Sequence, residues 1–165
     1  MFTLTLFFVS FLVAFIILGA VAKKQRQNAA TAMKRYLEQT GAQPILTAIP
    51  FRYKWLSEFS FYPSDTDSCD IYIADDHILI APDENFPVWG SPPPIVFTTE
   101  TQKLQAEFPY LKAFKTTRVL LNYYSNEVKI EYRNAYSVYY TIHLYDIPLE
   151  YFQAFEWLEK ETIEG

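Results

Sequence analysis

The pattern of hydrophobic and polar residues divides the chain into three parts, and the first is a continuous apolar stretch. Residues 1–22 carry no charged side chain, and Lys23, Lys24 and Arg26 follow at once. A helix of about 20 residues, rising about 1.5 Å per residue, crosses the hydrocarbon core of a bilayer. We therefore expect residues 1–22 to be a transmembrane helix that anchors the chain in the lipid bilayer.

The charges around this stretch indicate its orientation. Cationic flanks stay on the cytoplasmic side, so the amino terminus should lie outside and the rest of the chain in the cytoplasm, as in a single-pass protein of the cell membrane. A cleaved signal peptide is the alternative, because Ala20-Val21-Ala22 resembles a cleavage site. We favour the anchor, since no basic residue precedes the apolar stretch and the positive charges come after it.

The second part, residues 23–42, is rich in helix-forming residues and ends at Gly41, with Pro44 just beyond. One interpretation is a spacer that continues the anchor helix. The other is a basic surface on anionic lipid, worth about 1 kcal/mol per basic residue close to the membrane. The basic residues of this membrane-proximal segment are Lys23, Lys24, Arg26, Lys34 and Arg35.

The third part, residues 43–165, changes to a period of two, which is typical of strands. The pattern predicts about seven antiparallel strands. They fall within residues 45–61, 71–74, 78–82, 95–98, 117–124, 128–133 and 136–144. The clearest hairpin joins the second and third of these. Residues 82–94 are proline-rich and irregular, and residues 99–115 are compatible with either a short helix or a loop.

A C-terminal helix should follow the last strand. Pro148 suits the first position of a helix. Beyond it, Tyr151, Phe152, Phe155 and Leu158 fall three and four residues apart and make one apolar stripe. Such a helix must bury its stripe on the sheet.

Two segments carry a resemblance to a known family. They are CDIYIADDHILIAPD, residues 69–83, and NEVKIEYRNAYSVYYTIHLYDIPLEYFQAFEWLEK, residues 126–160. The first is similar to an early strand–turn–strand, and the second to the last two strands and capping helix, of bacterial pleckstrin-homology-like (PH-like) domains and their GRAM variant. The resemblance implies a mainly-β barrel capped by a C-terminal α-helix. It also implies a binding or assembly scaffold, usually without catalysis.

Phosphoinositide binding does not follow from this resemblance. Members that bind those lipids use basic residues near the first strand pair, whereas residues 63–70 here read PSDTDSCD. Phosphate beside these carboxylates would be repelled. We therefore expect no phosphoinositide affinity in residues 43–165.

Charge and cysteine content narrow the function further. Residues 1–35 have a net charge of +5, whereas residues 36–165 have −10. An acidic body is unsuited to nucleic acid, because phosphate contacts need clustered Lys and Arg. The single cysteine, Cys69, excludes an internal disulfide and suits a reducing compartment.

Carboxylates are the first candidate chemistry. Nine acids and no Lys or Arg occur between Trp55 and Gln102. Asp65, Asp67 and Asp70 are weak metal candidates, because the alternating spacing of a calcium loop is broken by Cys69 and no glycine occupies the turn. A metal-dependent hydrolase would need them to meet Asp83 or Glu84. A nucleophilic pair would need Cys69 beside His77 or His143, which the sequence does not indicate.

We expect a non-catalytic, membrane-tethered interaction module without a cofactor, with a protein partner or a second copy of itself. Its surface should include Tyr139 and Tyr145 on the outer side of the last strand, because exposed Tyr binds at low entropy cost. Trp89 should contribute beside Pro92–Pro94, a segment that either rigidifies a loop or binds an aromatic groove. A lipid- or small-ligand-binding barrel at the membrane surface and the hydrolase remain alternatives.

Overall fold

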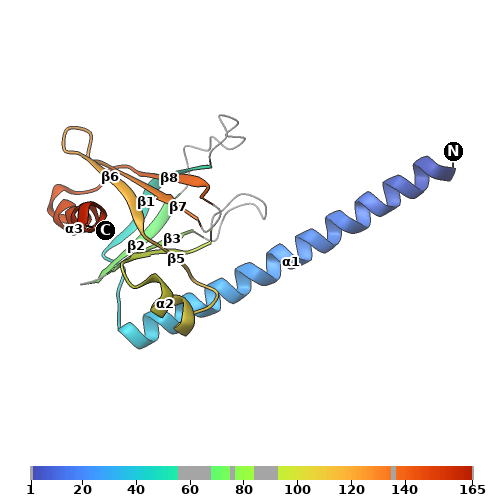
Figure 1. Ribbon diagram of the computed structural model, residues 1–165, viewed down its shortest axis with the longest axis horizontal. Helices are drawn as coiled ribbons and strands as arrows, with labels where there is room; N and C mark the ends of the chain where they lie inside the picture. The colour runs from blue at the N-terminus through green and yellow to red at the C-terminus, as the bar shows by residue number, and fades with distance from the viewer. Residues whose placement is uncertain (1, 56–67, 75–76, 84–92, 135–136, 165) are drawn as a thin grey trace.

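The computed structural model describes residues 2–55, 68–74, 77–83, 93–134 and 137–164 (Figure 1). Its elements are α1 (Phe2–Thr40), β1 (Leu46–Trp55), β2 (Ser68–Ala74), β3 (His77–Pro82), β4 (Ile95–Thr98), α2 (Thr101–Glu107), β5 (Lys112–Phe114), β6 (Thr116–Asn122), β7 (Glu127–Arg133), β8 (Tyr139–Leu144), the 3-10 helix η1 (Leu149–Tyr151) and α3 (Phe152–Glu164). A long apolar helix thus precedes a strand-rich body that a short helix completes.

Helix α1 runs without a break through both the apolar stretch and the basic segment. We call residues 2–22 its outer half and residues 23–40 its inner half. The helix ends where the sequence predicts. Gly41 has a φ of +66°, and its N–H donates to the carbonyl of Leu37 at 2.9 Å. This left-handed closure is the conformation that glycine adopts without strain.

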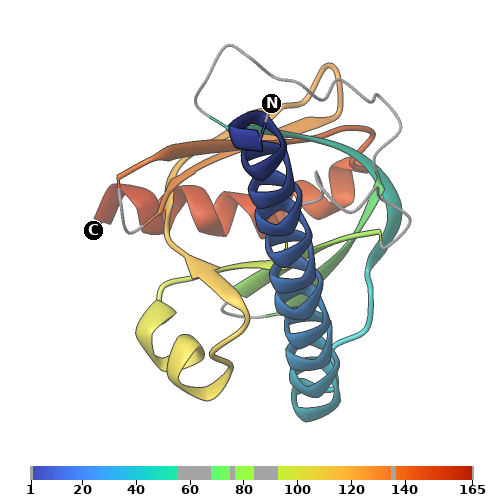
Figure 2. The ribbon, with the colours of Figure 1, turned by 90° about the vertical axis from the view of Figure 1, so that its right-hand side faces the viewer.

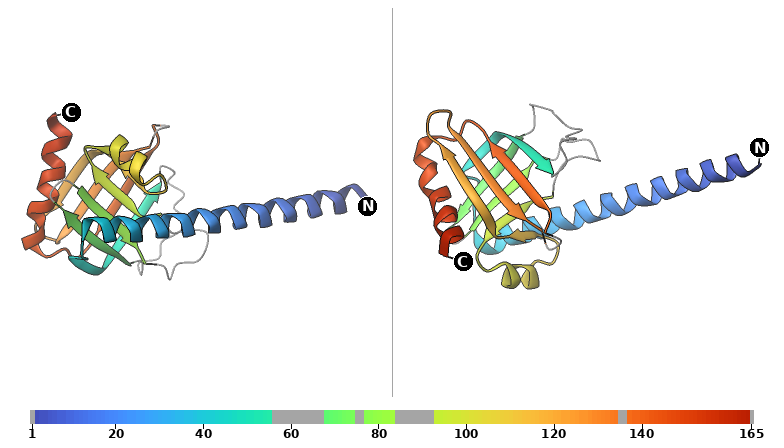
Figure 3. Two further views of the ribbon diagram at one scale, coloured as in Figure 1. Left: turned by 90° about the horizontal axis from the view of Figure 1, so that it is seen from below. Right: turned by 45° about the horizontal axis from the view of Figure 1, so that its top comes forward.

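The strands form one sheet in the order β5-β4-β3-β2-β1-β8-β7-β6, curled into a nearly closed barrel (Figure 3). Strand β1 belongs to both sides of the barrel, since Ile49 pairs with Cys69 of β2 and Phe51 pairs with Leu144 of β8. It bends at a register shift between Leu46 and Ile49, where Ala48 has a φ of +52°. This irregularity interrupts the alternation of residues 45–61.

The expectation of about seven, wholly antiparallel strands was wrong in one respect. The described residues contain eight strands, and β4 and β5 pair in parallel, with Val96 opposite Ala113. Parallel neighbours need a crossover of a dozen or more residues, and the segment carrying α2 supplies it. The predicted hairpin is confirmed, because residues 69–74 pair with residues 77–82. The last hairpin, β7 to β8, is also antiparallel.

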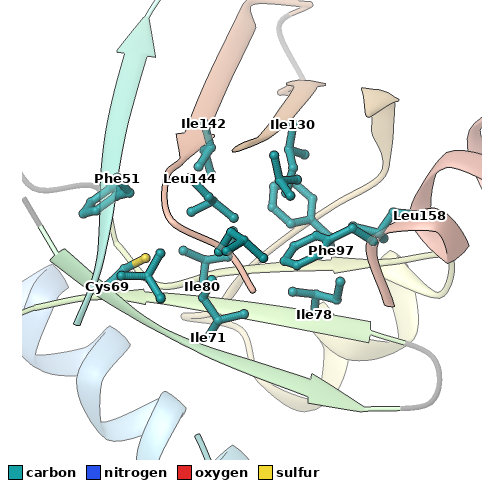
Figure 4. Close-up of a cluster of buried hydrophobic side chains, with 14 of the residues drawn as sticks. Phe51, Cys69, Ile71, Ile78, Ile80, Phe97, Ile130, Ile142, Leu144 and Leu158 are labelled. Atoms are coloured by element: carbon teal, nitrogen blue, oxygen red, sulfur yellow. The ribbon is translucent and has the colours of Figure 1, made fainter. Parts of the chain in front are cut away.

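The main core fills the barrel interior (Figure 4). In the close-up, Ile130, Ile142 and Leu144 point toward Ile78 and Ile80 from the opposite wall. The predicted stripe of α3 is also confirmed. Phe152, Phe155 and Leu158 are buried in this same core, and the Thr116 hydroxyl donates to the carbonyl of Leu158 at 3.2 Å. Helix α3 therefore lies along β6.

A second core lies outside the barrel, where α1 and α2 cover β2, β3 and β4 (Figure 2). Its buried residues are Ala32, Tyr36, Tyr72, Leu79, Ala81, Val96, Phe108 and Leu111. Strands β3 and β4 are thus buried on both faces, which explains their continuous apolar sequences ILIA and IVFT. The inner half of α1 is part of the folded body, not merely a spacer.

The two ends of the barrel differ in their relation to α1. In Figures 1 and 3 the outer half of α1 leaves the barrel on one side, while α3 and the β6–β7 turn lie at the opposite end. We call that opposite end the distal end.

Candidate interaction surfaces

The described side chains of the outer half of α1, those of residues 8–21, are almost all apolar and exposed. Phe8, Ile16 and Leu18 are 70%, 61% and 61% exposed. The helix is long and apolar enough to cross a membrane, by length and composition. An almost wholly apolar surface of this size is unfavourable in water, which favours an apolar environment or partner.

The inner half of α1 has two different faces. Ala29, Ala32 and Tyr36 are 3%, 9% and 1% exposed and face the body. The basic residues Lys23, Lys24, Lys34 and Arg35 are exposed, and Lys34 lies 3.9 Å from Glu38. The side chain of Arg26 lies outside the described residues. The basic surface expected from the sequence therefore coexists with a packed face.

The structure describes only one of the three metal candidates. Asp70 Oδ1 accepts the N–H of Ala48 at 3.1 Å, so it stabilises the bend of β1. Asp65, Asp67 and Glu84 lie outside the described residues, and Asp83 accepts a hydrogen bond from the Ser68 hydroxyl. Within the described ranges, no three His, Cys, Asp or Glu side chains group as a metal site would require. Whether the carboxylates meet stays untested.

The hypothetical Cys–His pair does not form. Cys69 is 1% exposed in the barrel core at the start of β2, and burial raises the pKa of its thiol. His77 lies at the other end of the same hairpin, opposite Ala74, and its ring packs edge-on against Tyr36 at 5.3 Å. Burial lowers the pKa of His77. His143 is on β8, where its ring stacks near Tyr145.

The expected aromatic surface on β8 is divided between two ends of the strand. Tyr139 is 42% exposed, and the guanidinium of Arg133 covers its ring at 4.0 Å. Tyr145 is half-buried and lies just past the other end of β8, with His143 beside it. Trp89 lies outside the described residues. Tyr139 and Tyr145 are therefore separated by the length of a strand, about 20 Å at about 3.3 Å per residue.

A stack of three tyrosines occupies the barrel interior near the β7–β8 end. Tyr140 stacks on Tyr53 with ring centroids 5.8 Å apart and on Tyr132 at 5.3 Å. The Tyr132 hydroxyl donates to the Tyr53 hydroxyl at 3.3 Å, and the Asn134 amide donates to the Tyr140 hydroxyl at 3.3 Å. Burial raises the pKa of Tyr53 to about 12 and also raises that of Tyr132, so both are neutral hydrogen-bonding groups. The inward alternation of β7 and β8 predicted Tyr132 and Tyr140 here, but not their partner Tyr53.

The most exposed aromatic side chain among the described residues of the body, that of Tyr124, lies at the distal end. Tyr123 and Tyr124, in the β6–β7 turn, are 51% and 102% exposed, and Leu149 of η1 is 53% exposed. The N–H of Ile147 donates to the carbonyl of Asn126 at 2.9 Å, which joins the turn to the segment before η1. The alternation of the sequence could not predict that Tyr123 and Tyr124 are exposed, because turn residues have no inner or outer face.

Comparison with known proteins adds no relative. No protein-family model, curated protein or solved structure matches the chain. The PH-like resemblance stays a prediction that rests on the residues that carry it.

Proposed function

We propose that this chain is a membrane-tethered, non-catalytic interaction module whose β-barrel, PH-like in layout, is held on the cytoplasmic side of the cell membrane. The observation that carries the proposal is the continuity of α1. One helix has an exposed apolar outer half and an inner half packed on the barrel. An anchor of this kind holds a body at the membrane surface in a defined orientation.

Charge supports the orientation. Lys23 and Lys24 are exposed directly after the apolar half, and such residues favour the cytoplasmic side. The buried Cys69 thiol is compatible with the same compartment. In this orientation the amino terminus is outside and the distal end of the barrel points away from the bilayer.

The packed barrel interior favours a scaffold over a ligand-binding barrel. Side chains from β1 to β8 and α3 fill the described interior with one contiguous apolar cluster. Small barrels of this size are commonly packed cores, whereas ligand-binding barrels enclose a cavity. Among the described residues, the tyrosine stack favours the alternative of a small-ligand barrel, because the hydroxyls of Tyr53 and Tyr132 lie 3.3 Å apart near one end of the interior.

Membrane insertion is tested by alkaline extraction of membranes from cells that express the full chain, with a compartment-sensitive reporter fused after Gly165. We expect the wild type to stay in the membrane pellet and the reporter to be active only in the cytoplasm. Leu12→Lys combined with Ile16→Lys should release the chain, since each charge costs about 2.5–3.5 kcal/mol near a helix centre.

A matched variant, Lys34→Leu with Arg35→Leu, alters hydropathy in the inner half and should stay inserted. Mature protein that begins near Lys23 in a secreted fraction would refute the anchor. A reporter active only outside the cell would refute the orientation.

A further inference from the structure

The distal end of the barrel carries three strongly exposed side chains, two aromatic and one aliphatic. We call Tyr123, Tyr124 and Leu149, with the acids around them, the distal surface. Exposed aromatic residues are the type most enriched at the energetic centres of protein interfaces. Their position away from the outer half of α1 leaves them accessible when the anchor is in a membrane (Figure 1).

Tyr123 and Tyr124 stand on a turn that several hydrogen bonds hold in place. Asn122 Oδ1 accepts the N–H groups of Tyr124 and Ser125 at 3.1 and 3.3 Å. The Tyr123 hydroxyl donates to Glu156 Oε1 at 2.7 Å, and its ring packs on Phe152 at 4.8 Å. A pre-organised aromatic surface loses little conformational entropy when it binds.

Charge around the distal surface has one sign. Glu127, Asp146, Glu150 and Glu156 belong to the same turn, loop and helix start, and Asp146 and Glu150 are exposed. Residues 119–128 and 144–156, which build this end, contain no Lys or Arg, and Lys129, the next residue on β7, forms an ion pair with Glu131. A partner that covers these carboxylates must supply cations, because a neutral partner would bury them unpaired.

We propose that the distal surface binds an arginine-containing segment of a partner protein. A guanidinium group can stack on a tyrosine ring and pair with a carboxylate at the same time. The apolar side chains of such a segment would pack beside Leu149. This proposal rests on the proposed function for the compartment in which the partner is met and for the shared orientation of anchored copies.

A second copy is a poorer occupant. Copies anchored in one membrane share an orientation, so their distal surfaces point the same way and do not face one another.

The test uses the full chain in phosphatidylcholine nanodiscs and a fluorescent short peptide of alternating Arg and Leu, with a Glu and Leu peptide for comparison. We expect saturable binding of the Arg peptide that weakens with salt and protects residues 119–128 and 144–152 from hydrogen exchange. Tyr124→Ser with Leu149→Ser should weaken binding on the order of tenfold or more. Both side chains are exposed, so the fold should persist.

Matched variants separate the surface from the overall charge. Glu150→Lys with Asp146→Lys should abolish binding, whereas Glu38→Lys with Glu107→Lys makes the same charge change elsewhere and should alter it less than about threefold. Tyr110→Ser removes another exposed tyrosine and should have no effect. The proposal would be overturned if both charge variants lost binding equally, or if the Arg peptide did not bind at all. It would also be overturned if the Glu peptide bound equally well, or if hydrogen exchange were slowed only in other segments. Retention of each variant in nanodiscs reports the anchor separately.

Discussion

Tyr36 is the largest buried side chain of α1 in the core that α1 shares with the barrel. It is 1% exposed, and its ring meets the rings of His77 and Phe108, each at 5.3 Å. Its hydroxyl has no hydrogen-bond partner among the described residues. The ring therefore stabilises the contact, whereas the buried hydroxyl adds a desolvation cost.

Substitutions at Tyr36 should separate these two effects. Tyr36→Phe should leave the free energy of unfolding unchanged or raise it by up to about 1 kcal/mol, because no bond is lost. Tyr36→Ala should lower it by about 3–5 kcal/mol through the cavity it leaves. Urea denaturation of the full chain in non-ionic detergent measures both. A large loss in Tyr36→Phe would show that the hydroxyl is bonded.

His77 should make stability depend on pH. Burial lowers its pKa below the ordinary 6.5, so the unfolded chain binds the proton more readily than the folded chain. Neutral His77 therefore contributes its full stability above about pH 6.5. This contribution is lost as the pH falls through that value toward the lower pKa of His77 in the folded chain. His77→Gln does not titrate, so the difference in unfolding free energy between wild type and variant should shrink or reverse from about pH 8 to about pH 5. A pH-independent difference would contradict this assignment.

The end of α1 is the element boundary that local chemistry sets most clearly. Gly41 has a φ of +66°, and a Cβ placed there would meet no heavy atom within 4 Å. The cost of a side chain at this position is therefore backbone strain alone. Gly41→Ala should destabilise the chain by about 1 kcal/mol and Gly41→Asn by less, because Asn tolerates this conformation better. Equal losses in thermal unfolding would point to a steric cause instead.

Elements with a local signature could be predicted from the sequence, and elements defined by distant contacts could not. The alternation of Val128, Ile130 and Tyr132 follows directly from one buried face, and the structure confirms it. Strand β5 has three residues, too few for a period, and exists through its pairing with β4. Ala29, Ala32 and Tyr36 do follow helical spacing, but their burial depends on an apolar outer face of β2–β4 that sequence alone does not show.

The expected aromatic surface was likewise predictable only where a local pattern applies. Tyr139 and Tyr145 were predicted to be outside from the strand period, which gives a face but not the neighbours on it. Arg133 covers the ring of Tyr139, and this contact depends on the pairing of β7 with β8. Tyr123 and Tyr124 lie in a turn, where no period applies and exposure is decided by the packing of α3 beside it.

At the scale of the whole molecule, α1 connects the apolar outer half to the barrel through one uninterrupted helix. The outer half lies in continuous helix with an inner half that packs on β2–β4 through Ala32 and Tyr36. About seven residues separate Ala22 from Ala29, a rise of about 10 Å. If the outer half spans a bilayer, the barrel has a fixed height and direction, and the distal surface is presented at a defined distance from the lipid.

Breaking the helix between these halves should remove this fixed geometry without removing the anchor. We expect a Gly-Gly-Ser-Gly insertion after Gln27 to broaden the distribution of distances between a fluorophore on Tyr124→Cys and acceptor lipids, because the linker no longer transmits orientation. Cys69 is buried, so a thiol reagent should label the new cysteine selectively. Insertion of four alanines is the matched control, since it continues the helix and should shift the mean distance by up to about 6 Å without broadening it. Equally broad distance distributions in the wild type and both variants would mean that α1 does not hold the barrel in one orientation. Alkaline extraction of all three proteins would show whether the anchor itself is intact.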